Sequence, residues 1–175
     1  MRFSIFSFLF FVTINSCFGQ SLNFIQKRDY RKNIRKMFKD DQAYRKNNLQ
    51  KDDSLWSCQN YNDSINKVKF IMLIGKYGYP SFERVKTEKA LILLLHFTSK
   101  QDYNELYLLF ENELKKGYMA PKDFAIWVDR CLVNQGVPVK YGVYVNPGFC
   151  PPDLLKMNKE RLLIGLKEFD SKLIY

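Results

Sequence analysis

The chain has 175 residues, a length that suits one domain with its own core rather than two. Apolar residues make up 46% of it and aromatic residues 16%, which excludes an intrinsically disordered chain, and four cysteines are too few for a disulfide-dense mini-protein. Lysine and arginine outnumber aspartate and glutamate by 28 to 18, a formal net charge of +10. No apolar run reaches the roughly 18 residues typical of a membrane-spanning helix.

The first residues are typical of a secretory signal peptide. Met1-Arg2 is a short basic start, Phe3–Ile14 is almost wholly apolar, and Cys17 and Gly19 place small residues before a cleavage point. We therefore expect residues 1–19 to be removed and the mature chain, from Gln20, to be exported to the periplasm or the exterior.

An alternative keeps Cys17, because the four residues that end at Cys17 resemble a bacterial lipobox, in which the cysteine is lipidated and becomes the N-terminus. Cleavage after Gly19 leaves three cysteines, Cys58, Cys131 and Cys150. Their spacing matches no metal motif, and the sequence leaves open whether two of them pair.

Helical periodicity begins soon after the signal. Apolar residues recur on one side of 25–48, and 51–60 has the composition of a polar joint. A second helix, capped by Asn62 or Asp63, is expected to end near Gly75–Gly78 because Pro80 follows. Its predicted core side consists of Ile65, Val68, Ile71, Met72 and Ile74.

Further along the chain, Thr87 can cap a helix that is apolar on every side and is therefore expected to be central and buried. Asp102 can cap a fourth helix that ends at Gly117. Pro121 opens a fifth, which ends at Gly136.

The C-terminal part is less regular. Residues 137–145 alternate weakly and predict an extended stretch or one short hairpin at most, with a turn at 146–148. A last helix, 154–173, is expected to be interrupted at Gly165. The sequence thus predicts an all-α fold, a single domain over residues 20–175 with about five to seven helices.

Short motifs along these helices resemble one family. They are Asp41-Gln42 with Arg45, Tyr77-Gly78-Tyr79-Pro80, His96, Asp129-Arg130, Gly136, Tyr141-Gly142, and Arg161 with Gly165-Leu166. In order and spacing, over roughly 41–175, they are similar to bacterial proteins catalogued as domain of unknown function 6624. The resemblance implies a helical fold and no established activity. The family's usual Gln-x-Tyr-Gly-Thr-Gln is altered here, with Val139, Val143 and Tyr144 at its polar places.

Six polar residues are candidates for a functional site. His96, Asp41 and Asp129 are candidate catalytic residues, and Arg45, Arg130 and Tyr141 are candidate ligand-binding residues. Structural roles are favoured: an Asp41–Arg45 ion pair one helical turn apart, a core histidine with satisfied ring nitrogens, and an interhelical salt bridge from Asp129-Arg130. The alternative is a hydrolase or lyase in which His96, Asp41, Arg45, Asp129 and Arg130 converge on one pocket.

Known catalytic and cofactor motifs are absent from the sequence. It contains no Gly-x-Ser-x-Gly, phosphate loop, His-Glu-x-x-His or dinucleotide-binding glycine pattern, so we expect no cofactor and no metal site.

The segment 27–51 carries ten lysines and arginines against three aspartates. A face of this kind is suited to an anionic surface or a protein partner, although it is also what a plain solvated helix would present. Export argues against nucleic acid as the partner. The sequence favours a non-enzymatic binding or interaction module.

Overall fold

The computed structural model describes residues 21–45, 53–145 and 151–169. The expected signal peptide, Cys17, Cys150, the turn at 146–148 and the basic residues Lys46 and Lys51 lie outside these ranges. Within them the chain forms helices and no strand, which confirms the all-α fold class. The helices are α1 (Phe24–Arg45), α2 (Asp53–Tyr77), α3 (Phe82–Val85), α4 (Lys89–Leu94), α5 (Lys100–Lys115), α6 (Pro121–Asn134) and α7 (Leu154–Leu163).

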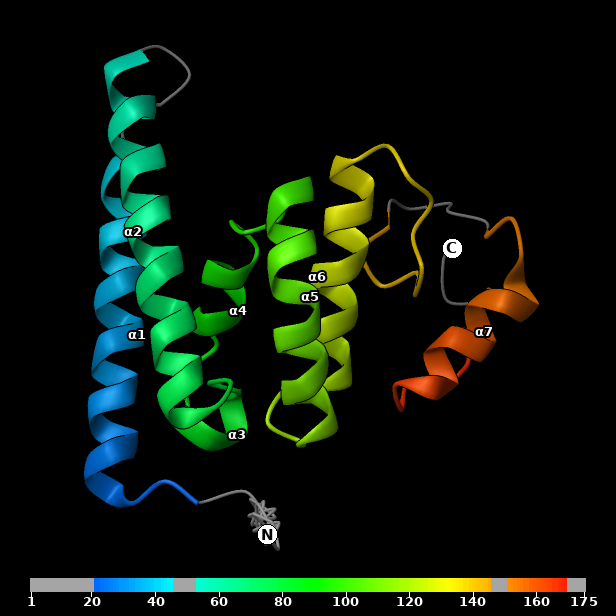
Figure 1. Cartoon of the computed structure of the whole chain (residues 1–175), viewed down its shortest axis with the longest axis horizontal. Helices are drawn as coiled ribbons and strands as arrows, with labels where there is room; N and C mark the ends of the chain where they lie inside the picture. Colours follow the sequence, from blue (N-terminus) through cyan, green and yellow to red (C-terminus); the bar gives the residue numbers. More distant parts are fainter. Residues whose placement is uncertain (1–20, 46–52, 146–150, 170–175) are drawn as a thin grey trace, which may run out of the picture.

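Two antiparallel helix pairs form the body of the molecule (Figure 1). The long helices α1 and α2 pack along each other on one side, and α5 and α6 form the second pair. The short helices α3 and α4 fill the space between the pairs and contact α1. Helix α7 lies beyond α6, at the far end from α1.

A series of aromatic contacts joins the two pairs through the core. The ring of Phe70 on α2 meets that of Tyr79 at 6.3 Å between centroids, and Tyr79 meets Phe110 on α5 at 6.3 Å. Phe110 in turn meets Trp127 on α6 edge-to-face at 4.7 Å. All four side chains are fully buried, so this series fixes the separation of the helix pairs.

Helix α2 differs most from expectation. It begins at Asp53, so the segment predicted as a polar joint is helical; its Gln59 is buried and donates to Asp63 one turn on. The predicted core side is partly wrong, because Val68 and Met72 are exposed and Phe70, which the prediction left out, is buried. Ile74 is buried as predicted, and Ile71 is partly buried against the core. The buried side of α2 carries the polar residues Gln59 and Asn66, so its apolar pattern does not indicate which side faces the core.

The helices in the middle of the chain are shorter than expected. The helix predicted after Thr87 is the six-residue α4, preceded by the unexpected four-residue α3, and Ile92 of α4 is exposed. The N-cap of α5 is Ser99, with Asp102 at the third helical position of a capping box.

Several predicted helix ends are confirmed. Pro121 opens α6, and Gly117 and Gly136 follow α5 and α6 with positive φ. Residues 137–145 contain neither helix nor strand, and α7 ends just before Gly165 without resuming within 166–169.

We expect Gly78→Ala to destabilise the protein by about 2 kcal/mol more than Gly136→Ala. Both glycines have positive φ (76° and 68°), so both variants carry the same backbone strain. A Cβ at Gly78 would collide with the Tyr118 ring and the Arg84 guanidinium, whereas a Cβ at Gly136 meets nothing within 4 Å. Urea unfolding of the two variants measures the difference, and equal losses of stability would contradict the close packing of this loop.

Candidate functional site

A chain of polar side chains lies where α1, α2 and the end of α4 meet. Asp41 points from α1 into the core and is only 1% exposed. Arg45, one turn further on, donates from Nε to Asp41 Oδ1 at 3.3 Å and from Nη2 to Asp63 Oδ2 of α2 at 2.7 Å. The guanidinium therefore bridges two carboxylates from different helices, and the predicted Asp41–Arg45 pair is confirmed.

His96 reaches the other oxygen of Asp41. It follows α4 directly, its side chain is 18% exposed, and its Nε2 lies 3.3 Å from Asp41 Oδ2. This is a close contact rather than a hydrogen bond, because Nε2 is buried without a hydrogen-bond partner, and the expectation that both ring nitrogens are satisfied is therefore wrong. Gln42 Nε2 donates to the same Asp41 oxygen at 2.7 Å.

The two carboxyl groups of this polar chain are shifted in opposite directions. Burial by itself raises the pKa of Asp41, but its contacts with His96, Gln42 and Arg45 outweigh burial and hold the pKa below its usual range. Burial raises the pKa of Asp63 and outweighs the lowering effect of Arg45 and Gln59.

This chain of polar side chains is compatible with either a structural role or a catalytic one. It links α1, α2 and the end of α4 through polar contacts, as a structural cluster would. A histidine beside a buried, ionised carboxylate is also the arrangement used for general acid–base catalysis. Among the described residues, no group of three or more His, Cys, Asp and Glu side chains is placed to hold a metal ion.

Asp129 belongs to a different part of the molecule. Its Oδ1 accepts the backbone N–H groups of Lys140 and Tyr141 at 2.9 and 2.8 Å, and its Oδ2 accepts those of Val143 and Tyr144 at 2.7 and 3.3 Å. Burial raises the pKa of Asp129, although all four donors act to lower it. The residue thus fixes the loop after α6, and the interhelical salt bridge expected from sequence is replaced by these backbone contacts.

Arg130, next to Asp129, also contacts the loop after α6. The guanidinium of Arg130 lies 5.4 Å from the centre of the Tyr144 ring, a cation–π distance. Asp129, Arg130 and Tyr141 are therefore grouped around the loop at 140–144. Asp41, Arg45 and His96 are grouped at the junction of α1, α2 and α4.

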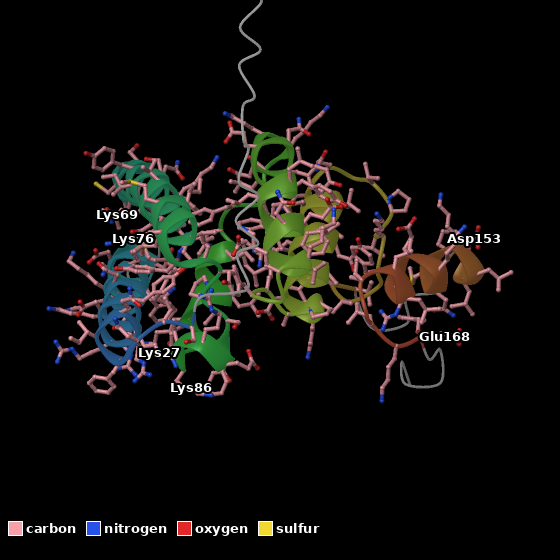
Figure 2. All side chains as sticks on the ribbon, turned by 60° about the horizontal axis from the view of Figure 1, so that its bottom comes forward. Lys27, Lys69, Lys76, Lys86, Asp153 and Glu168 are labelled. Atoms are coloured by element: carbon pink, nitrogen blue, oxygen red, sulfur yellow. The ribbon has the colours of Figure 1, made fainter. Side chains whose placement is uncertain are left out.

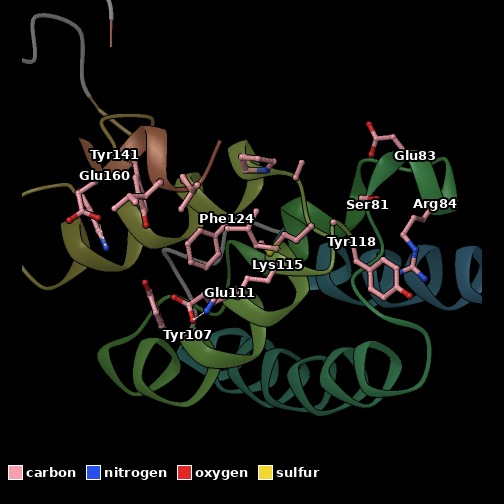
Figure 3. A pocket seen from close by; sticks show the side chains of 18 residues that line it. Ser81, Glu83, Arg84, Tyr107, Glu111, Lys115, Tyr118, Phe124, Tyr141 and Glu160 are labelled. Atoms are coloured by element: carbon pink, nitrogen blue, oxygen red, sulfur yellow. Dashed lines mark hydrogen bonds and ion pairs between the residues drawn. The ribbon is translucent and has the colours of Figure 1, made fainter. Parts of the chain in front are cut away.

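Tyr141 lines a cavity of about 680 Å³ between α3, α5, α6 and α7 (Figure 3). Two ion pairs flank it, Lys115–Glu111 at 2.6 Å and Lys140–Glu160 at 3.1 Å. Phe124 and apolar residues of α5, α6 and α7 line the interior. The cavity has the size of a small-ligand site, and Lys115, Glu111, Lys140 and Glu160 at its edge are already paired with one another.

The outward side of α1 is basic. Arg28, Lys32, Arg35 and Lys39 are exposed there, at spacings that place them on one face. Figure 2 shows the labelled lysines on α1, on α2 and beside α3 at one end of the molecule, and Asp153 and Glu168 at the other. The end around α7 also carries exposed lysines, namely Lys156, Lys159 and Lys167.

The described cysteines offer no reactive thiol pair. Cys58 is exposed and Cys131 is buried, and both are free thiols. Burial raises the pKa of Cys131 to about 12, so its thiol stays protonated near neutral pH.

Comparison with known proteins identifies no relative: no family model, curated protein or solved structure matches the chain. None of the helices within the described residues combines the length and apolar character needed to cross a bilayer.

Sequence reasoning missed three members of the polar chain, namely Asp63, Gln59 and Gln42. A signal was present for two of them, since Gln59 and Asp63 are one helical turn apart and face the same way once the helix is extended back to Asp53.

We expect Asp129→Asn to lower stability by about 2–4 kcal/mol, because the amide NH₂ would face two backbone N–H donors and leave buried groups unpaired. Asp153→Asn is the matched control: Asp153 caps α7 through Lys156 N at 2.8 Å, and asparagine caps equally well, with a change below about 0.5 kcal/mol. Urea unfolding distinguishes the two, and equal effects would contradict the loop-fixing role.

Proposed function

We propose that this protein is an exported, non-enzymatic binding module that docks on an anionic partner through the outward face of α1. The observation that carries the proposal is that only one of the four cations on that face, Arg28, has a carboxylate of the described residues within ion-pair distance, that of Asp29 at 3.9 Å. Lys32, Arg35 and Lys39 are exposed, and none of them has a carboxylate of the described residues within ion-pair distance.

The geometry of α1 makes these charges act together. Neighbouring turns of a helix are about 5.4 Å apart, less than the screening length of about 8 Å at physiological salt. The fields of successive cations therefore add along the helix. A row of this kind attracts a polyanion or an anionic surface and gives little selectivity among such partners.

The internal packing of α1 keeps the row in place. Tyr30, Ile34 and Met37 are buried on the opposite side of the helix, so α1 cannot rotate its cations away from solvent without losing core contacts.

The triple variant Lys32→Gln/Arg35→Gln/Lys39→Gln is expected to bind anionic vesicles and soluble polyphosphate at least about tenfold more weakly than the wild type, since three exposed charges are lost. The matched control is Lys156→Gln/Lys159→Gln/Lys167→Gln, which removes the same charge from exposed positions near α7 and should have a small effect. Vesicles of phosphatidylglycerol and phosphatidylcholine in sedimentation assays at several salt concentrations provide the measurement.

Two outcomes would contradict the proposal. One is binding that does not change between low and high salt. The other is an equal loss of binding in the two triple variants, which would show that overall charge matters and that the face of α1 does not.

A second candidate function is supported by the 3.3 Å approach of His96 Nε2 to Asp41. In this alternative the protein is a hydrolase or lyase in which His96 transfers a proton, Asp41 orients it and Arg45 binds an anionic group. Asp129 and Arg130 contact the 140–144 loop instead, so they are not part of this proposed active site.

Variants of His96 separate the structural role from the enzymatic one. If His96 is a core residue, His96→Ala leaves a cavity and unpaired neighbours and costs about 1–3 kcal/mol, whereas His96→Gln, which retains a donor and an acceptor, costs less. Thermal melting of both variants provides the measurement. Unchanged melting temperatures in both would contradict the structural role and favour the enzyme.

A further inference from the structure

Helix α2 exposes a stripe of apolar side chains on its outward face. Tyr61, Val68 and Met72 are 67%, 58% and 69% exposed, and Ile65 between them is half-buried. Their spacing of three and four residues places them in one row about 16 Å long. A contiguous apolar row on a protein surface is typical of an interaction site.

At Met72 this row reaches the groove between α2 and α1. A groove of about 370 Å³ runs between the two helices, with Lys36 and Asp40 of α1 on one side and Lys69 and Met72 of α2 on the other. The lysines of both helices lie toward the same end of the molecule (Figure 2). We call the exposed cations of α1, Lys69 and the apolar row together the outer α1–α2 face.

We propose that the outer α1–α2 face docks on an anionic phospholipid bilayer, with Tyr61, Val68 and Met72 entering the headgroup region and the cations of α1 contacting lipid phosphates. This inference rests on the proposed function and narrows its partner to a lipid surface.

The combination of charge and apolar surface selects the bilayer among anionic partners. A soluble polyanion neutralises the cations of α1 but offers no apolar environment to the row on α2. The boundary between headgroups and acyl chains offers both, and interfacial helices bury their apolar side about 5–10 Å deep there. A second copy of the chain fits less well, because symmetric pairing through this face brings like charges together.

The test compares two pairs of exposed apolar residues. Val68→Ser/Met72→Ser removes part of the row, and the control Leu155→Ser/Leu163→Ser removes apolar side chains of α7 that are 84% and 71% exposed. Each variant is titrated with vesicles of phosphatidylglycerol and phosphatidylcholine and, separately, with soluble polyphosphate. Circular dichroism verifies that each variant is folded.

We expect Val68→Ser/Met72→Ser to bind the vesicles about tenfold more weakly than the wild type and to bind polyphosphate equally well, because only the bilayer contacts apolar side chains. The control pair should match the wild type with both probes. Vesicle binding that is unchanged in Val68→Ser/Met72→Ser, or reduced equally in the control, overturns the bilayer inference. Wild-type protein that binds neither probe overturns the proposed function itself.

A second measurement does not depend on the loss of affinity. Val68→Trp places a fluorophore in the row, and bilayer docking predicts a blue shift on adding vesicles and quenching by brominated acyl chains, both beyond what the natural Trp56 and Trp127 give. Binding of Val68→Trp to the vesicles without these changes overturns the inference, because the row then stays in water.

Discussion

The bridge that Arg45 makes between Asp41 and Asp63 ties α1 to α2 and, together with the buried apolar side chains of α1, favours one orientation of that helix. A carboxylate as buried as Asp41 is costly unless it is paired, so the bridge favours one rotation of α1 in which Asp41 faces inward. Tyr30 and Ile34 lie on the same inward side and are buried with it. The cations of α1 are consequently directed outward, where the proposed partner would meet them.

Buried carboxylates also fix the irregular segments. Glu113 accepts the backbone N–H of Tyr79 at 2.7 Å, and Asp129 accepts four N–H groups of the loop at 140–144. Backbone donors outside helices need such acceptors when they are buried. Asp41, Asp102, Glu113 and Asp129 are all buried, whereas no lysine or arginine is among the buried residues described. Three of these carboxylates also pair with cations, Asp41 with Arg45, Asp102 with Lys67 and Glu113 with Lys116, whereas Asp129 is held by backbone N–H groups.

The sequence predicted what depends on local chemistry. Pro121 at the start of α6 and the glycines after α5 and α6 mark helix ends by their own backbone preferences. The Asp41–Arg45 pair is also local, since one helical turn separates the two residues. The approach of His96 to Asp41 and the contacts of Asp129 with a loop eleven to fifteen residues away depend on tertiary packing, which no periodicity encodes.

The error on α2 has a physical reason that bears on the proposed docking. Apolar periodicity identifies residues that share one side of a helix, but it does not show whether the protein covers that side. The spacing predicts that Val68 and Met72 lie in the core, yet the core side of α2 carries Gln59 and Asn66 beside Phe70. The helix therefore has two apolar-bearing sides, and the protein covers only one of them. If α2 docks on an anionic bilayer as proposed, Val68 and Met72 also leave water. The apolar pattern of the sequence then matches the residues that are buried in the docked state, which include more than those buried in the free protein.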